Sequence, residues 1–267
     1  MEAVDKFFIE DGHLDSIKNF KDDEINKAKV IYEVIRVNNE KPLFLRAHLR
    51  RLEKSFEIMG KVFSYRYDKI SEYLERVIYA NDRKDGNIKI TFNIDEDVMK
   101  VFYIKHSYPT EEMYKNGVNT ILYHGERHNP NAKVIDGEFR KKVNEKIKES
   151  GAFEAILVDN NGYITEGSKS NIFLIKDNKL LTSKVETVLP GVTRGEVIEI
   201  AKRESIKFEE VDFKFTKLEE VESMFISGTS PGILPISKVG NILMNVDNEI
   251  MRRLMGIYNK KELSQND

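Results

Sequence analysis

Hydrophobic and polar residues in the first hundred positions follow two different periods. The stretch "KVIYEVIRV" (29–37) repeats every two residues, so it predicts a strand with Tyr32, Val34 and Arg36 on one face. After a polar turn, "LRAHLRRLEKSFEIMG" (45–60) has apolar residues at helical spacing and ends on a glycine, as helices often do. The same reasoning predicts another helix and a pair of strands, at 69–81, 87–94 and 97–106. Helices and a sheet therefore share this region.

The second half of the chain combines short strands with two helices. The stretch "GEFRKKVNEKIKESG" (137–151) carries a narrow apolar stripe, which predicts a charged helix with one buried edge. Strand periodicity on both sides of "DNNG" and "KDNK" predicts hairpins over 154–166 and 171–183. A second helix begins at "LPGVTR", where unpaired N–H groups of the first turn favour an anion. A strand and a loop of small residues follow at 223–236.

Proline and glycine mark a candidate boundary between these two halves. The segment 109–117 begins with Pro109, ends with Gly117 and has no strand periodicity, so we expect an interdomain linker there. A length of 267 residues with 40% hydrophobic content is enough for two compact units. The expected organisation is a small N-terminal α/β domain at 1–108 and a larger domain at 118–267.

Composition excludes several classes of function. The chain has no cysteine, so disulfides and thiolate chemistry are excluded. Its net charge is -2 and no basic stripe with aromatic residues occurs, so nucleic acid is not an expected partner. The five histidines show no ligand spacing, which argues against a metal site. With no signal-peptide pattern and no long apolar run, we expect a cytoplasmic protein that does not bind membranes.

The stretch "GYITEGSKSNIF" (162–173) looks at first like a phosphate-binding loop. A nucleotide loop needs the lysine directly after its second glycine, at the start of a helix. Here Ser168 separates Gly167 from Lys169, and the residues that follow have the β-branched and aromatic character of a strand. We therefore interpret this stretch as the corner between two hairpins.

Four stretches taken together resemble one enzyme family. They are "YEVIR…HLRRL", "TEGSKSNIF", "LPGVTR" and "FISGTS", in this order. The chain is similar over 28–59 and 133–236 to the fold-type IV pyridoxal phosphate enzymes. These are the class IV aminotransferases, including branched-chain and D-amino acid aminotransferases, and aminodeoxychorismate lyase. The resemblance implies an α+β or α/β fold with a C-terminal pseudo-barrel domain, the cofactor pyridoxal 5'-phosphate held between the two domains, and a homodimer.

The resemblance also assigns the catalytic residues. Lys133 matches the family lysine that forms an imine with the cofactor and moves a proton at the substrate's α-carbon. Asp136 and Glu138 depart from the family pattern close to it, where they could change the pKa of the lysine. Glu166 matches the glutamate that faces the pyridine nitrogen and keeps the ring able to accept electrons. The alternative for Glu166 is a solvated glutamate in a turn.

The phosphate of the cofactor is expected at other positions. Arg51 matches the family arginine that binds it, and the neighbouring Arg50 lies further from the apolar stripe of the helix, so it is expected in solvent. The resemblance adds residues from two loops, one of which packs on the ring face while the others bind the phosphate: Leu189, Val192, Thr193, Thr229 and Ser230. The alternative is that these loops are ordinary turns.

The substrate site departs from the family. Several members carry an Arg-Gly pair that helps to bind the substrate carboxylate, where this chain reads "TFNIDED". Tyr32 matches a tyrosine of the substrate pocket, and Arg36 or Arg127 could replace the missing arginine. The alternative is that both arginines are solvated or paired with acidic neighbours.

The sequence thus predicts a pyridoxal phosphate-dependent aminotransferase. It would move an amino group between an amino acid and a 2-oxo acid. The first alternative is a lyase of the same fold that acts on an aminated chorismate-like substrate with the same lysine. The second is a binding module without catalytic activity, which intact Lys133, Glu166 and Arg51 argue against.

Overall fold

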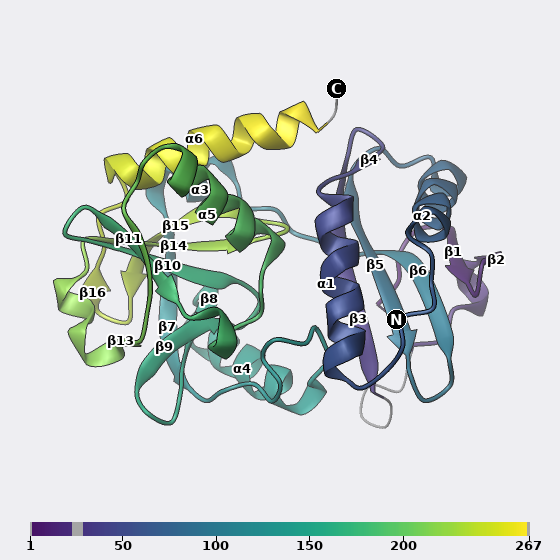
Figure 1. Cartoon of the computed structure of the whole chain (residues 1–267), viewed down its shortest axis with the longest axis horizontal. Coiled ribbons are helices and arrows are strands. Elements are labelled where there is room, and N and C mark those ends of the chain that lie inside the picture. Colours follow the sequence, from purple (N-terminus) through teal and green to yellow (C-terminus); the bar gives the residue numbers. More distant parts are fainter. Residues whose placement is uncertain (1, 23–28, 266–267) are drawn as a thin grey trace. The chain divides into compact units, whose positions relative to one another are not determined.

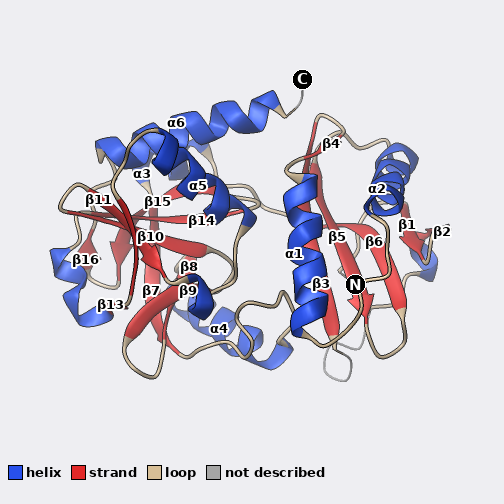
Figure 2. Ribbon diagram, in the orientation of Figure 1, coloured by secondary structure: helices blue, strands red, loops and turns tan. Residues whose placement is uncertain are grey.

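The structure is a computed structural model that describes residues 2–22 and 29–265. It divides into two compact units, each with its own sheet (Figures 1 and 2). Unit 1 comprises Met1–Ser107, Ala132–Gly137 and Glu262–Asp267, and unit 2 comprises Tyr108–Asn131 and Glu138–Lys261. The short segment 132–137 therefore packs with residues far before it in the sequence. The domain boundaries proposed from the sequence, at 1–108 and 118–267 with a linker at 109–117, stay a prediction.

Unit 1 is an antiparallel sheet with two helices. The strand order is β2-β1-β6-β5-β3-β4, and every neighbouring pair is antiparallel. The elements are β1 (Phe7–Glu10), β2 (His13–Ser16), the short 3-10 helix η1 (Ile17–Asn19), β3 (Val30–Asn38), β4 (Lys41–Pro42), α1 (Leu45–Ile58), α2 (Tyr67–Asn81), β5 (Gly86–Asn93) and β6 (Val98–Ile104). The predicted strands and helices of this region are confirmed, and the hairpin of β1 and β2 is an addition.

The two faces of this sheet differ in character. Alternation along each strand sends Ile31, Ile35 and Ile90 to the face that packs on α1 and α2, where they form the core of the unit. The opposite face carries polar residues such as Lys89 and Thr91, yet these are also buried. Part of the cover comes from an apolar cluster that includes residues of the N-terminal segment, namely Ala3, Phe8, Ile17, Phe20, Phe102 and Ile104.

Unit 2 is a closed barrel with additional strands. Six strands follow one another in the order β10-β14-β15-β7-β8-β9, and β9 pairs back with β10, which closes the sheet. The pairs β15 with β7 and β7 with β8 are parallel. The elements are α3 (Glu111–Asn116), β7 (Val118–His124), α4 (Gly137–Ser150), β8 (Glu154–Val158), β9 (Tyr163–Gly167), β10 (Asn171–Lys176), β11 (Lys179–Ser183), η2 (Val185–Thr187), α5 (Val192–Arg203), β12 (Phe208–Val211), β13 (Phe213–Lys214), η3 (Phe215–Glu220), β14 (Ser223–Gly228), β15 (Gly232–Val239), β16 (Ile242–Leu243) and α6 (Glu249–Ser264).

Alternate residues of the barrel strands form its main core. Ile172 with Leu174 on β10, and Met224 with Ile226 on β14, have the two-residue spacing of one sheet face. Helix α4 packs separately through Val143, against Ala155 and Leu157 of β8. The predicted hairpins and both predicted helices are confirmed. Helix α3 lies within the segment that the sequence suggested as a linker.

Candidate active site

Lys133 is held by hydrogen bonds of the main chain along an edge of β3. The N–H of Tyr32 donates to the carbonyl of Lys133 at 3.0 Å, and the N–H of Ile135 donates to the carbonyl of Val30 at 3.0 Å. An antiparallel bridge joins the residues next to Lys133 and Tyr32. The segment therefore extends the sheet of unit 1, which fixes the direction of the Lys133 side chain.

Helix α1 fixes the same lysine from a second direction. The N–H of Lys133 donates to Ser55 Oγ at 3.1 Å, and Ser55 Oγ donates to the carbonyl of Arg51 at 3.0 Å. Ser55 is fully buried. Of the two nearby departures from the family pattern, Glu138 is exposed and pairs with Lys142 on α4. Two elements of unit 1 thus position the predicted catalytic residue.

The ammonium group of Lys133 lies over the ring of Tyr32. Its Nζ is 4.6 Å from the ring centroid, a contact of the cation–π type. The structure therefore brings together the predicted catalytic lysine and the predicted substrate-pocket tyrosine. They are far apart in the sequence, and the pairing of 132–135 with β3 places them together.

A buried ionic cluster of Glu33, His48 and Arg51 lies between β3 and α1. Arg51 Nε donates to Glu33 Oε2 at 2.9 Å, Arg51 Nη2 donates to Glu33 Oε1, and His48 Nδ1 is 3.2 Å from the same Oε1. Burial raises the pKa of Glu33, but the charge of Arg51 and the hydrogen bonds from His48 and Arg51 outweigh it and hold that pKa well below its usual range. Burial also lowers the pKa of His48. At neutral pH the cluster is one carboxylate, one guanidinium and a neutral imidazole.

The helix phase predicted for the two arginines of α1 is confirmed. Arg51 is buried and Arg50 is exposed. Glu33 accepts hydrogen bonds from Nε and Nη2 of Arg51. Within residues 2–22 and 29–265, Nη1 of Arg51 donates to no acceptor. Glu33 is a residue that the sequence pattern did not single out. A lone carboxylate in the apolar register of a strand, facing an arginine-bearing helix, was the available signal.

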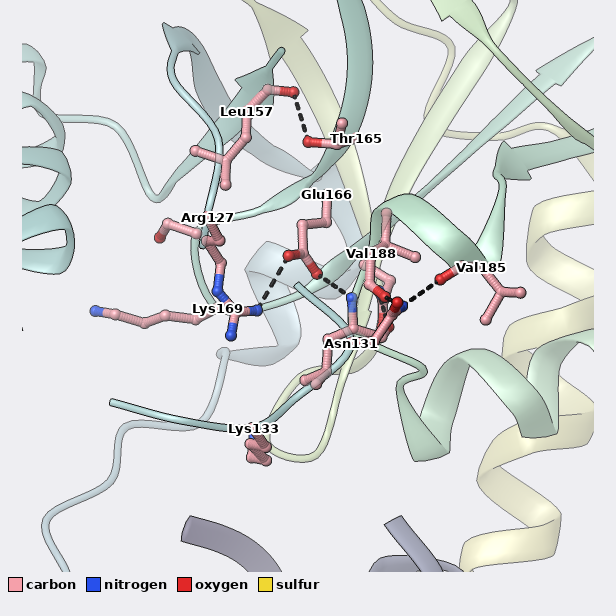
Figure 3. Close-up of polar contacts among 12 residues, drawn as sticks. Arg127, Asn131, Lys133, Leu157, Thr165, Glu166, Lys169, Val185 and Val188 are labelled. Carbon is pink, nitrogen blue, oxygen red and sulfur yellow. Dashed lines mark hydrogen bonds and ion pairs between the residues drawn. The ribbon is translucent and has the colours of Figure 1, made fainter. Parts of the chain in front are cut away.

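In unit 2, the carboxylate of Glu166 is buried and hydrogen-bonded on both oxygens. Arg127 Nη1 donates to Oε1 at 3.0 Å (Figure 3), and the N–H of Leu189 donates to Oε2 at 3.0 Å. Only 3% of Glu166 is exposed. The alternative of a solvated turn glutamate is therefore wrong. Arg127, a candidate for binding the substrate carboxylate, instead forms an ion pair with Glu166, the glutamate predicted to face the ring nitrogen.

A second carboxylate, that of Glu154, holds the turn after Glu166. It accepts hydrogen bonds from its neighbour's N–H and from N–H and hydroxyl groups of the turn, which are Ala155 N, Ser168 N, Ser168 Oγ, Lys169 N and Ser170 Oγ. A Cβ on Gly167 would lie 2.2 Å from Ser170 Oγ, so only glycine fits there. The stretch that resembled a phosphate loop is thus a turn closed on a buried carboxylate.

The entrance of α5 is shaped by Gly191 and Asn171. Asn171 Nδ2 donates to the carbonyl of Leu189 at 2.8 Å, and a Cβ on Gly191 would lie 2.0 Å from Asn171 Oδ1. Val192 and Thr193 occupy the first turn and are buried. Thr193 Oγ1 lies 3.5 Å from the hydroxyl of Tyr258. Thr229 and Ser230 are half-buried in the turn between β14 and β15, in the same unit.

Asn131 anchors the chain two residues before Lys133. Its Nδ2 donates to the carbonyls of Val185 and Val188, at 2.6 and 2.7 Å (Figure 3). All three residues belong to unit 2. This anchoring by Asn131 has no signal in the sequence, because an asparagine in a polar loop has no distinguishing pattern.

Arg36, the other arginine considered for the substrate, also has a carboxylate partner. Its Nη1 lies 3.3 Å from both carboxylate oxygens of Glu262. The alternative in which both arginines pair with acidic neighbours therefore describes the structure. A role of Arg36 or Arg127 in binding substrate stays a prediction.

Two features of the described residues bear on other functions. Within residues 2–22 and 29–265, no helix combines the length and the apolar character needed to cross a membrane. In the same part of the chain, no group of three or more histidine, aspartate and glutamate side chains is arranged to hold a metal ion.

Comparison with known proteins agrees with this architecture. A family model described as amino-transferase class IV matches residues 30–239. A D-alanine aminotransferase of Bacillus licheniformis is 27% identical over 222 residues, which is 78% of this chain and 78% of the relative. The crystal structure of a branched-chain aminotransferase from Thermoproteus uzoniensis with norvaline has a TM-score of 0.88 and 22% identity, and the match covers 99% of this chain and 97% of that one.

A further solved structure carries a form of the cofactor. It is a T.th. branched-chain amino acid aminotransferase with pyridoxamine 5'-phosphate, at a TM-score of 0.84 and 20% identity, covering 97% of this chain and 94% of that one. These likenesses place the fold in the fold-type IV class. The chain belongs to the class IV aminotransferases, a family of pyridoxal phosphate-dependent enzymes. The resemblance and the fold class predicted from the sequence are confirmed.

Proposed function

We propose that the protein is an aminotransferase that uses pyridoxal 5'-phosphate to move an amino group between an amino acid and a 2-oxo acid. The observation that carries this proposal is the placement of Lys133. Its main chain is fixed by β3 and by Ser55 of α1, and its ammonium group lies on the ring of Tyr32. A base that moves a proton must be held within reach of one atom, and these contacts supply that constraint.

Within this proposal, the candidate residues fit the chemistry of the cofactor. The bound cofactor supplies an electron sink as the α-proton leaves the substrate. Glu166 offers a buried carboxylate, oriented by Arg127 and the N–H of Leu189, for a protonated ring nitrogen. Leu189 would pack on the ring face. Lys133 would move the proton at the α-carbon of the substrate, as the acid–base group of the exchange.

The phosphate would be bound by charge and by main-chain N–H groups. Glu33 holds Arg51 through Nε and Nη2, so Nη1 of the same guanidinium is the group that would donate to a phosphate oxygen. In unit 2, the first turn of α5 begins at a glycine that leaves no side chain over it, a typical anion site. The hydroxyl and N–H donors in this proposal are those of Val192, Thr193, Thr229 and Ser230.

Absorption spectroscopy of the purified protein tests the proposal directly. A cofactor band that shifts when an amino acid is added, and returns when a 2-oxo acid is added, is the expected result. A chain with no cofactor band after incubation with pyridoxal 5'-phosphate would contradict it and support a binding module. Release of a 2-oxo acid from an aminated chorismate-like substrate, with no acceptor needed, would instead identify the lyase.

We also propose that the enzyme is a cytoplasmic homodimer, as the resemblance implies. Light scattering of the purified protein, expected to give twice the mass of one chain, tests the oligomeric state. Fractionation of cells tests the location.

A further inference from the structure

The polar face of the unit 1 sheet holds a buried lysine that the proposed mechanism does not use. In the pairing of β3 with β5, Tyr32 lies opposite Thr91, and Val34 lies opposite Lys89. Directly opposed residues point to the same face, and so do residues two apart on one strand. Tyr32, Thr91 and Lys89 therefore share the face that points away from α1 and α2.

Lys89 is a desolvated carboxylate-binding group. It is only 2% exposed, and its ammonium group donates to both carboxylate oxygens of Glu2, at 2.8 and 2.6 Å. A buried ammonium group requires a carboxylate partner, because losing its hydration without one is costly. Glu2 comes from outside the sheet and its side chain is 42% exposed. A fixed buried cation thus faces an anion supplied by a solvent-exposed residue.

The same ring connects Lys89 to the proposed catalytic lysine. Lys89 Nζ lies 5.1 Å from the centroid of the Tyr32 ring, and Lys133 Nζ lies 4.6 Å from it. The two ammonium groups can be no further apart than the sum of these distances. In an amino acid whose α-carbon lies at Lys133, the α-carboxylate is one bond away and a side-chain carboxylate is a few bonds away. The distance between the ammonium groups of Lys133 and Lys89 therefore suits a single small substrate. All of these residues belong to unit 1.

Thr91 provides a second, independent observation at this place. It is 2% exposed, and its Oγ1 is buried without a hydrogen-bond partner among residues 2–22 and 29–265. A buried hydroxyl that lacks a partner costs free energy, so such groups usually point to a ligand or to water. A carboxylate at Lys89 could accept a hydrogen bond from this hydroxyl.

We propose that Lys89 binds a carboxylate of the amino-acid substrate, with the hydroxyl of Thr91 as a second donor, and that Glu2 occupies this position until substrate displaces it. The inference rests on the proposed aminotransferase function. It gives β5 a cation for the substrate, although the stretch "TFNIDED" at the end of this strand lacks the Arg-Gly pair of other family members. Arg36 and Arg127 pair with carboxylates that are more buried than Glu2, since the side chain of Glu262 is 12% exposed and that of Glu166 is 3% exposed.

The test compares variants of Lys89 with a control lysine in the cofactor-loaded protein, beside Glu2→Gln, Arg36→Gln and Arg127→Gln. Lys89→Met removes the charge and keeps most of the side-chain volume, Lys89→Arg keeps the charge, and Lys100→Met is the matched control. Lys100 is also a buried lysine on this face; its ammonium group donates to the carbonyl of Lys21 at 3.0 Å and lies 3.9 Å from a carboxylate oxygen of Glu10. The dissociation constants of an amino acid and of a 2-oxo acid are measured from the spectral change, beside the cofactor affinity and the melting temperature of the apo form.

The expected result is a loss of substrate affinity of roughly ten- to a hundred-fold in Lys89→Met, the size of one charge-assisted contact. Lys89→Arg should recover most of this loss, and cofactor affinity and Lys100→Met should stay near wild type. Glu2→Gln should tighten substrate binding, because it removes the internal competitor. Unchanged substrate affinity in Lys89→Met, or an equal loss in Glu2→Gln, would overturn the proposal and leave a structural ion pair.

A panel of substrates identifies the carboxylate. An equal loss for neutral and acidic amino acids indicates the α-carboxylate, and a loss confined to acidic amino acids indicates the side-chain carboxylate. Failure of the proposed function shows differently, as the absence of any amino-acid response in the wild-type protein. If Arg36→Gln or Arg127→Gln loses substrate while Lys89→Met does not, that arginine binds the carboxylate and the proposal for Lys89 is wrong.

Discussion

Each unit of the molecule contains a buried carboxylate, and the two are stabilised by different means. Glu33 in unit 1 is stabilised by charge, since Arg51 and His48 both contact it. Glu154 in unit 2 is stabilised by neutral N–H and hydroxyl groups, most of them from one turn. A carboxylate paired by charge is sensitive to pH and to loss of its partner, whereas one bound by neutral donors depends on the geometry of its turn.

This contrast explains how two kinds of site are built. The charge-paired cluster orients a guanidinium and lies next to Ser55, which holds the main chain of Lys133. The neutral cluster closes the turn that follows Glu166, and so fixes the end of β9. Glu166 combines both means, because one oxygen accepts from Arg127 and the other from a main-chain N–H.

The largest expected effect is the loss of catalysis in Lys133→Ala, a change that leaves Glu33 and Glu154 in place. Lys133→Ala should slow transamination by about 10²- to 10⁴-fold, since it removes the proposed acid–base group, while unfolding stays close to wild type. Borohydride reduction followed by peptide mapping should label the peptide that contains Lys133. A label on Lys141 or Lys142 would show that the alignment with the family is wrong.

The charge-paired side of the comparison is tested by Glu33→Gln. Removing one partner leaves the guanidinium of Arg51 buried without its anion, so the free energy of unfolding should fall by about 3–5 kcal/mol. Urea denaturation of the apo protein measures this. The control is Glu57→Gln, which breaks an exposed pair with Lys54 and should cost less than about 1 kcal/mol. Equal effects would show that burial does not distinguish the two pairs.

Glu166→Gln tests the carboxylate that combines both means. The amide keeps the shape of the side chain, so the cofactor should remain bound. Removal of the α-proton should slow by about 10²-fold, the usual effect of one preorganised electrostatic group. Stopped-flow measurement of the half-reaction reports this rate. Unchanged turnover would exclude a role for Glu166 at the ring nitrogen.

The neutral side of the comparison is tested by Glu154→Gln. An amide replaces one acceptor oxygen with a donor that faces other donors, so the expected cost is about 1–3 kcal/mol of unfolding free energy. The matched position is Glu209, an exposed partner of Lys179, where the same change should be nearly neutral. A loss as large as that of Glu33→Gln would remove the proposed distinction between the clusters.

The smallest expected effect is a dependence of stability on pH just below neutrality, which we expect from His48 of the charge-paired cluster. The pKa of His48 is lowered in the folded state, chiefly by burial, so the unfolded chain binds the proton more readily. Above about pH 6.5, the pKa of histidine in the unfolded chain, the neutral His48 does not lower the free energy of unfolding. As the pH falls below this value, the free energy of unfolding declines by at most about 1.4 kcal/mol per pH unit. His48→Gln should flatten this part of the profile in urea denaturation. Glu33, whose pKa is also lowered, should add a further decline only in more acidic solution.

Much of the fold follows from local patterns. Period-two stretches became β3, β5 and β6, and apolar residues at helical spacing became α1, α4 and α5. Helix α6 was missed, although its buried residues have the helical spacing of Met251, Leu254, Met255 and Tyr258. The hairpin of β1 and β2 was missed because its strands are short and its second strand is largely exposed.

The resemblance to the family selected Lys133, Glu166 and Arg51, and their roles stay predictions. The phase of α1 correctly buried Arg51 and exposed Arg50. The partners of these residues were not predictable. Glu33 has one local signal, a lone carboxylate in the apolar register of a strand, whereas Asn131 and Glu154 have none of their own, since each acts through a hydrogen bond to a residue distant in the chain.

The sequence by itself determined which residues are available for the chemistry and which element carries each of them, because periodicity and turn residues act over a few positions. Only the tertiary structure decided the pairs: Lys133 with Tyr32, Arg127 with Glu166, Arg36 with Glu262, and Lys89 with Glu2. The physical reason is that a charge or a hydrogen-bond donor accepts any complementary partner. The packing of distant segments selects one partner by bringing it within a few ångströms and excluding water from the pair.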